Sequence, residues 1–287
     1  MTVRTVQCRP MQDDMTRPVD RDQLSVLVAV VLLGNVLFRY IELPEQHFRT
    51  QFLGSPVEIH LTGASLIVVL LVALVCTGTN LILHSRGRQM HASGRPVYIA
   101  WILPGMVAGL SGHTLAQDLL PTLWVGGLVL TGFAVALTIS AEYKAVSPDA
   151  PGYPGARLVL NVLVYMIAFV LFSMMYATRS RSLVTATFAM FVAALLALDL
   201  VSIADAPLSR VLIFAGIVGL VIGECTWVLN YWQVSSWVAG LLLLLVFYVI
   251  TNLAHQHLLD RLSRATLIEF GAVAVIVWAF VLFVGLR

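Results

Sequence analysis

The stretch IHLTGASLIVVLLVALVCTGTNLIL, residues 59–83, decides the fold class, because it contains no aspartate, glutamate, lysine or arginine. A helix needs about 20 apolar residues to cross the hydrocarbon core of a bilayer. This stretch is long enough, and a continuous helix satisfies every backbone hydrogen bond internally where no water is present. Residues 59–83 are therefore predicted to form a transmembrane helix.

Eight further apolar stretches resemble this one, so we predict about nine transmembrane helices. Apolar residues make up 59% of the 287 residues and charged residues only 11%, whereas a soluble domain usually carries about 25% charged residues. We expect an all-α, polytopic helix bundle in the cell membrane, surrounded by the lipid bilayer and in contact with other membrane proteins. The predicted spans are residues 24–43, 59–83, 97–110, 120–140, 158–177, 183–203, 211–229, 237–254 and 266–286.

The basic residues are distributed unevenly between the two sides of this bundle. Cytoplasmic loops carry an excess of arginine and lysine, which places the N-terminus in the cytoplasm. Residues 1–22 lack the apolar core of a secretory signal peptide and are predicted to be a solvated tail, and residues 23–287 the transmembrane domain. The basic residues on the predicted cytoplasmic side are Arg4, Arg9, Arg17, Arg21, Arg86, Arg88, Arg95, Lys144, Arg157, Arg210, Arg261 and Arg264.

The third span is the weakest of the nine. It is short, and Pro104 removes a backbone donor, so we expect a kink or a tilt there. If this segment did not cross the bilayer, every later span would reverse its orientation. The excess of arginine and lysine on the predicted cytoplasmic side supports a third span that crosses the bilayer.

Ionisable side chains inside a membrane are costly, so each is a candidate functional residue. Glu224 is the deepest carboxylate on the outer side, and Arg39 is the basic residue within a span on that side. We expect the two to pair, or Glu224 to be protonated. With His60 and Glu58, predicted to open the second span, they form a candidate outer polar site. The alternative is an ion pair that only joins two helices.

A second, weaker group lies on the inner side and comprises His84, Asn252, His255 and Glu269. His84 and His255 are placed where they could bind a haem or a metal ion together. However, the histidine, cysteine and carboxylate spacing of a metal site is absent from the sequence. We therefore predict no metal site and no cofactor.

Small residues recur every fourth position in the seventh span, at Ala215, Gly219 and Gly223. Such a stripe lets a neighbouring helix approach closely. We therefore expect this span to be central and Glu224, one position further, to face protein. Trp232 and Trp237 fit an interfacial aromatic belt.

Two other functional classes are disfavoured by the sequence. The segment GLSGH, residues 109–113, resembles the glycine-framed serine of intramembrane serine proteases, but the serine lies at a helix end and the downstream histidine helix is missing. Glycine-rich nucleotide-binding motifs are also absent. The net charge is only +2, with scattered basic residues, so nucleic acid is not an expected partner.

Several segments resemble a family of uncharacterised bacterial multi-pass membrane proteins that is known only as a domain of unknown function. The segments are LGSPVEIHLT (residues 53–62), AEYK (141–144), GECTWVLNYWQVSSWVAGLLLLLVFYV (223–249) and HQHLLDRLSRATLIEFG (255–271). The resemblance implies an integral membrane protein and assigns no catalytic residue.

Three functional hypotheses follow from these patterns. The first is a non-enzymatic scaffold or a subunit that binds lipid or partner proteins, because the loops are short and no dense charge relay is present. The second is a carrier for a small polar or lipid-like solute that uses Glu224 and Arg39. The third is a membrane-embedded lipid-modifying enzyme, which requires His60 and Glu58, or His255 and Glu269, to converge.

Overall fold

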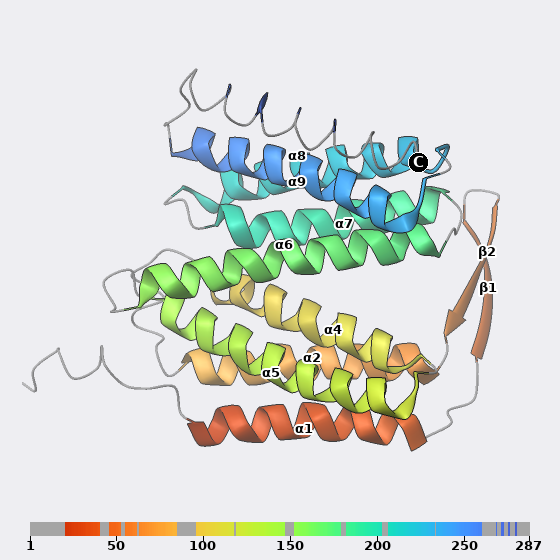
Figure 1. Cartoon of the computed structure of the whole chain (residues 1–287), viewed down its shortest axis with the longest axis vertical. Helices are drawn as coiled ribbons and strands as arrows, with labels where there is room; N and C mark the ends of the chain where they lie inside the picture. The colour runs from red at the N-terminus through yellow and green to blue at the C-terminus, as the bar shows by residue number, and fades with distance from the viewer. Residues whose placement is uncertain are drawn as a thin grey trace, which may run out of the picture.

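The computed structural model describes residues 21–40, 46–52, 55–61, 63–84, 96–117, 119–146, 152–178, 182–202, 206–232 and 234–259, together with residues 268, 271, 272, 275 and 279. These residues form eight α-helices, one short 3-10 helix and one two-stranded hairpin (Figure 1). In chain order the elements are α1 (Arg21–Tyr40), β1 (Gln46–Phe52), β2 (Ser55–Leu61), α2 (Gly63–His84), η1 (Val97–Trp101), α4 (Ile102–Leu115), α5 (Pro121–Ala145), α6 (Tyr153–Ala177), α7 (Ser182–Val201), α8 (Leu208–Leu229) and α9 (Ser236–Leu258).

Six of these helices are long and apolar enough to cross a bilayer, namely α2, α5, α6, α7, α8 and α9. Their outward faces are apolar as well: Leu130 and Phe133 on α5 are 66% and 64% exposed. Apolar surface of this extent needs lipid around it. The chain is thus a multi-pass membrane protein. The number of nine spans and the orientation stay predictions, because α1 and α4 are not among these six helices and most of the predicted ninth span lies outside the described residues.

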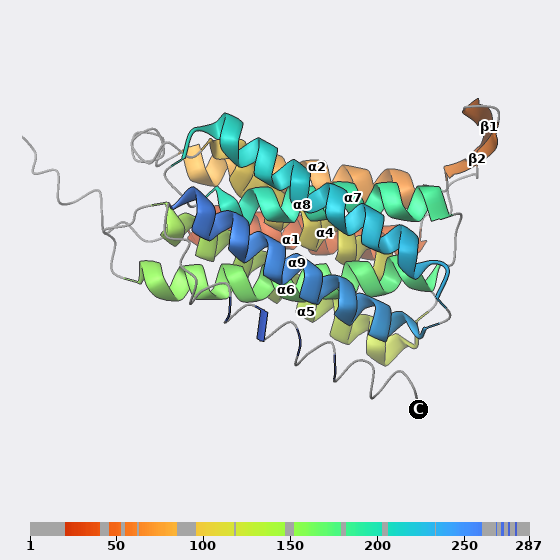
Figure 2. The same ribbon diagram turned by 90° about the horizontal axis from the view of Figure 1, so that it is seen from above.

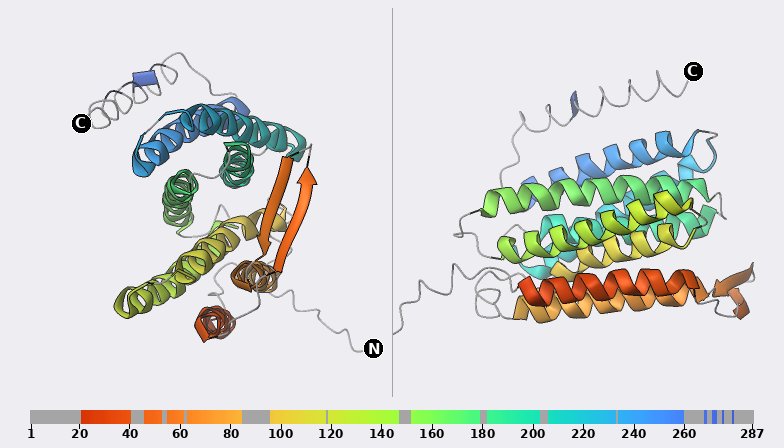
Figure 3. Two further views of the ribbon diagram at one scale, coloured as in Figure 1. Left: turned by 90° about the vertical axis from the view of Figure 1, so that its right-hand side faces the viewer. Right: turned by 60° about the horizontal axis from the view of Figure 1, so that its bottom comes forward.

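The helices form two halves that lie side by side (Figures 1 and 3). The first half contains α1, α2, η1, α4 and α5, with α4 packed on α2 and α5. The second half contains α6 to α9, with α7 packed on α8 and α6 on α9. The halves meet where α5 contacts α6, and where α4 and η1 contact α7. As a result, α1 and α8 lie at opposite sides of the bundle.

The predicted third span continues further than residue 110. It starts as one turn of 3-10 helix, η1, and continues as α4 to Leu115. Because α4 begins at Ile102, Pro104 lies in its first turn, where a backbone N–H has no partner within the helix. The proline therefore sits where α4 tolerates it, and the change in helical geometry occurs just before it.

A β-hairpin connects α1 to α2 and extends past the helix ends (Figure 2). The prediction that the second span begins at residue 59 was wrong, because residues 59–61 belong to β2 and α2 begins at Gly63. The sequence Val57-Glu58-Ile59-His60-Leu61 alternates apolar and polar residues, which is the period of a strand. This alternation was the signal for the hairpin.

Candidate functional site

The structure does not bring the two central residues of the predicted outer site together. Arg39 is exposed at the end of α1, and its guanidinium carbon lies 5.1 Å from the centre of the Trp124 ring on α5. This geometry is that of a cation–π contact. Glu224 is on α8, on the opposite side of the bundle (Figure 1). The expected Arg39–Glu224 pair is therefore not formed.

The orientation of Glu224 also differs from the prediction. Glu224 is exposed on α8, not turned toward a neighbouring helix. One residue along an α-helix corresponds to a rotation of about 100°, so a residue next to the small-residue stripe is turned away from the helix that the stripe contacts. The stripe itself was predicted correctly, since Gly219 and Gly223 are buried against α7.

The other outer candidates, Glu58 and His60, lie in β2 and do not open a helix. In the hairpin register, Glu58 is opposite Arg49 and His60 is opposite His47. Both residues therefore lie at the hairpin end of the bundle. A functional role for them stays a prediction.

The inner candidates are divided between the two halves. His84 is the last residue of α2, whereas Asn252 and His255 are on α9, and Glu269 lies outside the described residues. The Asn252 amide donates to the Tyr165 hydroxyl at 3.0 Å and to the Tyr248 carbonyl at 2.8 Å. Asn252 thus ties α9 to α6, a contact that stabilises helix packing.

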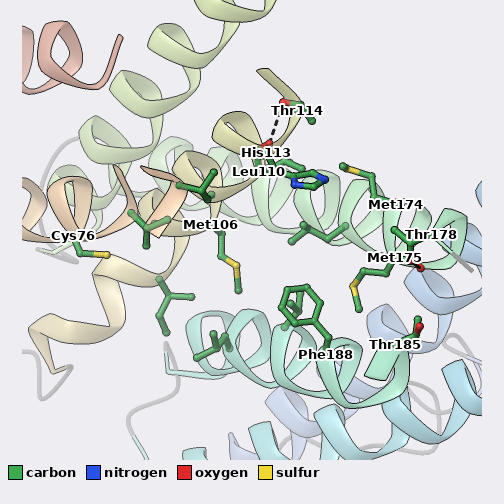
Figure 4. Close-up of a pocket in the computed structure, with 18 of the residues that line it drawn as sticks. Cys76, Met106, Leu110, His113, Thr114, Met174, Met175, Thr178, Thr185 and Phe188 are labelled. Atoms are coloured by element: carbon green, nitrogen blue, oxygen red, sulfur yellow. Dashed lines mark hydrogen bonds between the residues drawn. The ribbon is translucent and has the colours of Figure 1, made fainter. Parts of the chain in front are cut away.

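The candidate site that the structure shows is a cavity between the two halves, with a volume of about 1130 Å³. One wall is formed by α2, η1 and α4, and the opposite wall by α6 and α7 (Figure 4). The walls come from helices that are far apart in the sequence. The cavity therefore depends on how the two halves sit together.

Most of the cavity wall is apolar and rich in sulfur-containing side chains. Met106 of α4, Met174 and Met175 of α6, and Phe188 of α7 surround its middle, and Cys76 of α2 lies at one end (Figure 4). Methionine side chains are flexible and polarisable, so they adapt to ligands of different shape. A wall of this composition suits a hydrocarbon chain.

Polar side chains gather at the other end of the cavity, which we call the polar end: His113, Thr114 and Gln117 from the last turn of α4 and the residues that follow it, Thr178 at the end of α6, and Thr185 at the start of α7. Thr114 donates its hydroxyl to the carbonyls of Leu110 and Ser111, both at 3.0 Å. The described lining residues include no aspartate, glutamate, lysine or arginine.

The glycines of α4 bring this helix close to α2. A Cβ at Gly105 would lie 3.0 Å from the Cys76 sulfur, and one at Gly112 would lie 3.1 Å from a Val68 methyl. The segment GLSGH is thus part of a packing surface and a cavity wall. Ser111 is buried and donates to the Ala108 carbonyl of its own helix at 3.1 Å.

The cavity residues were missed as a group by the sequence-based prediction, which considered His113 only as part of the segment GLSGH. Two carboxylates, Glu142 on α5 and Asp199 on α7, are buried in the bundle. Both interact with neighbouring groups and neither lines the cavity.

A family model described as a protein of unknown function, DUF5656, matches residues 43–284. The chain belongs to the DUF5656 family. The matched region of this DUF5656 chain includes every residue that lines the cavity. The predicted resemblance to a membrane protein family of unknown function is thereby confirmed. Searches of curated proteins and of solved structures returned no match.

Proposed function

We propose that this protein binds a membrane lipid, or a lipid-like molecule, in the cavity between its two halves. The observation that carries the proposal is the combination of a long apolar wall with one polar end. Ligand pockets usually have volumes of about 300–1,000 Å³ and a mostly apolar lining with a few polar groups. The volume of about 1130 Å³ exceeds that range and is large enough for a molecule with an extended tail.

The length of the cavity supports a lipid in particular. Along η1 and α4 the lining runs from Tyr98 to Gln117. At a rise of about 1.5 Å per residue this segment is roughly 28 Å long, close to the thickness of about 30 Å of a bilayer's hydrocarbon core. A lipid tail lying along α4 would therefore stay at its usual depth.

The rim of the cavity supports entry from the bilayer. Val184 and Phe188 on α7 are each 52% exposed, and Tyr98 on η1 is 46% exposed. These large side chains lie along the two walls and present apolar or amphipathic surface at the opening. A lipid can pass between them without its tail entering water.

A substitution that fills the cavity tests this function. We expect Met106→Trp to lower the amount of lipid that copurifies with the protein several-fold, because the larger ring occupies the middle of the cavity. The measurement is native mass spectrometry of the protein released from detergent, followed by lipid extraction and quantification. The matched control is Leu130→Trp on α5, where the side chain is 66% exposed on the outer face. Equal lipid content in both variants would contradict the proposal.

A carrier is a second candidate function, favoured by the position of the cavity between two halves. The halves are joined in sequence by the segment between α5 and α6, where Gly152 has a φ of +99°. Carriers work by rocking one half against the other around a central site. Such a carrier would use the cavity and not Glu224 or Arg39, which do not line it.

The carrier function predicts that the protein moves lipid between leaflets. Reconstituted in vesicles containing a fluorescently labelled lipid, the wild-type protein and Leu130→Trp should let a membrane-impermeant quencher reach the inner-leaflet label over time, and Met106→Trp should not. Lipid binding without any translocation would refute the carrier and leave the binding function intact.

A further inference from the structure

The polar end of the cavity offers hydrogen-bond acceptors to a ligand. While the Thr114 hydroxyl donates to carbonyls of its own helix, its oxygen is left to accept from a ligand. Thr178 likewise donates to the Met175 carbonyl at 2.8 Å. The His113 ring and the Gln117 amide can each accept as well as donate.

The helix ends at the polar end carry opposing partial charges. α4 ends there at Leu115 and α6 at Ala177, whereas α2, from Gly63, and α7, from Ser182, begin there. The C-terminus of a helix carries a partial negative charge and the N-terminus a partial positive one. The helix ends therefore favour neither an anion nor a cation.

The formal charges of the lining distinguish charged from uncharged head groups. Binding a phosphate typically involves Arg or Lys side chains, and the described lining residues include neither. A carboxylate would stabilise a fixed cation most directly, and neither buried carboxylate, Glu142 or Asp199, lines the cavity. The loop that contains Arg179 and Arg181 lies outside the described residues.

We propose that the cavity selects lipids with an uncharged head group that donates a hydrogen bond, which means hydroxylated lipids such as diacylglycerols or long-chain alcohols. This inference rests on the proposed lipid-binding function and specifies its ligand. The tail lies against Met106, Met174 and Met175, and the ligand hydroxyl lies at the polar end, where it donates a hydrogen bond to the Thr114 oxygen.

The test compares four lipids with identical oleoyl chains that differ only at the third glycerol carbon: a hydroxyl, its methyl ether, a phosphate and a trimethylammonium group. Each is titrated into the delipidated full-length protein, and bound lipid is counted by native mass spectrometry. We expect the hydroxyl lipid to bind about 2- to 10-fold more tightly than the ether, the usual range for one neutral hydrogen bond. The phosphate and ammonium lipids should bind more weakly still.

Thr114→Val separates recognition of the head group from general folding. This variant should reduce the affinity for the hydroxyl lipid to that of the ether and leave ether binding unchanged. The matched control is Thr187→Val on α7, an exposed threonine whose hydroxyl also donates to its own helix, to Leu183 at 2.8 Å. It should bind all four lipids like the wild-type protein.

The outcomes distinguish this inference from the function on which it rests. If the phosphate or ammonium lipid binds best, or if all four bind equally and Met106→Trp blocks them, the head-group inference is wrong and lipid binding stands. If none of the four binds, or if Met106→Trp leaves binding unchanged, the proposed function itself fails.

Discussion

Replacing Gly219 with alanine is expected to lower the free energy of unfolding by about 1–3 kcal/mol, the usual effect of overpacking. A Cβ at this position would lie 2.6 Å from the Met190 carbonyl oxygen and 2.8 Å from the Ala194 Cβ on α7. Real Cβ atoms do not come within 3.0 Å of such neighbours, and a backbone carbonyl cannot rotate away. The substitution therefore forces α7 and α8 apart.

The control lies on the same helix. Gly216 is exposed on α8, and a Cβ there would have no neighbour within 4 Å. Alanine is favoured over glycine inside a helix by about 0.8–1.0 kcal/mol, so Gly216→Ala should be neutral or slightly stabilising. Gly219→Ala should thus lower the melting temperature in detergent, measured by tryptophan fluorescence, whereas Gly216→Ala should leave it unchanged or raise it slightly. Equal shifts would show that α7 and α8 are not in contact at Gly219.

The second large effect is expected for Tyr176→Phe. Tyr176 on α6 is buried, and its hydroxyl bonds to the carbonyls of Leu229, at 3.1 Å, and of Trp232. These carbonyls lie where α8 ends and the chain turns toward α9, so the hydroxyl stabilises a helix terminus that needs external partners. The Leu229 carbonyl still accepts from the Trp232 N–H at 2.9 Å. Phenylalanine therefore removes the hydrogen bonding of the hydroxyl without leaving that carbonyl unpaired, and the loss of such a bond typically destabilises a protein by about 0.5–1.5 kcal/mol.

Phenylalanine keeps the ring, so packing changes little and the effect can be attributed to the hydroxyl. Tyr231→Phe is the matched control, because Tyr231 is 77% exposed and its hydroxyl only accepts from the Trp227 indole at 3.4 Å. We expect its effect to stay within about 0.5 kcal/mol, as for most surface substitutions. Similar losses of stability in both variants would contradict the role assigned to Tyr176.

The features that the sequence predicted well depend on one helix at a time. The length and composition of residues 59–83 identified a span, and the four-residue spacing of Gly219 and Gly223 identified a helix contact. The hairpin was missed because Ile59 and Leu61 are apolar and directly precede α2, so a strand of alternating residues was read as the start of the span.

Features that depend on two distant helices could not be predicted in this way. An apolar residue on a membrane helix has the same signature whether it contacts protein, lipid or a ligand, since all three surroundings are apolar. Met106 and Phe188 line one cavity although they are on helices from different halves. Arg39 and Glu224 were predicted to pair because both are on the outer side of the predicted bundle. The sequence does not give the packing order of the helices, which places α1 and α8 far apart.

The contact of α7 with α8 through Gly219 has a consequence for ligand selection. Where the backbones of α7 and α8 are in direct contact, no flexible side chains lie between them. The part of the cavity wall on α7 that carries Thr185 and Phe188 is therefore supported rigidly by α8. The facing wall of the cavity, formed by α2, η1 and α4, carries the flexible thioether of Met106. We therefore expect the protein to accept tails of varied length and unsaturation, because only one of its two surfaces has to reshape around them.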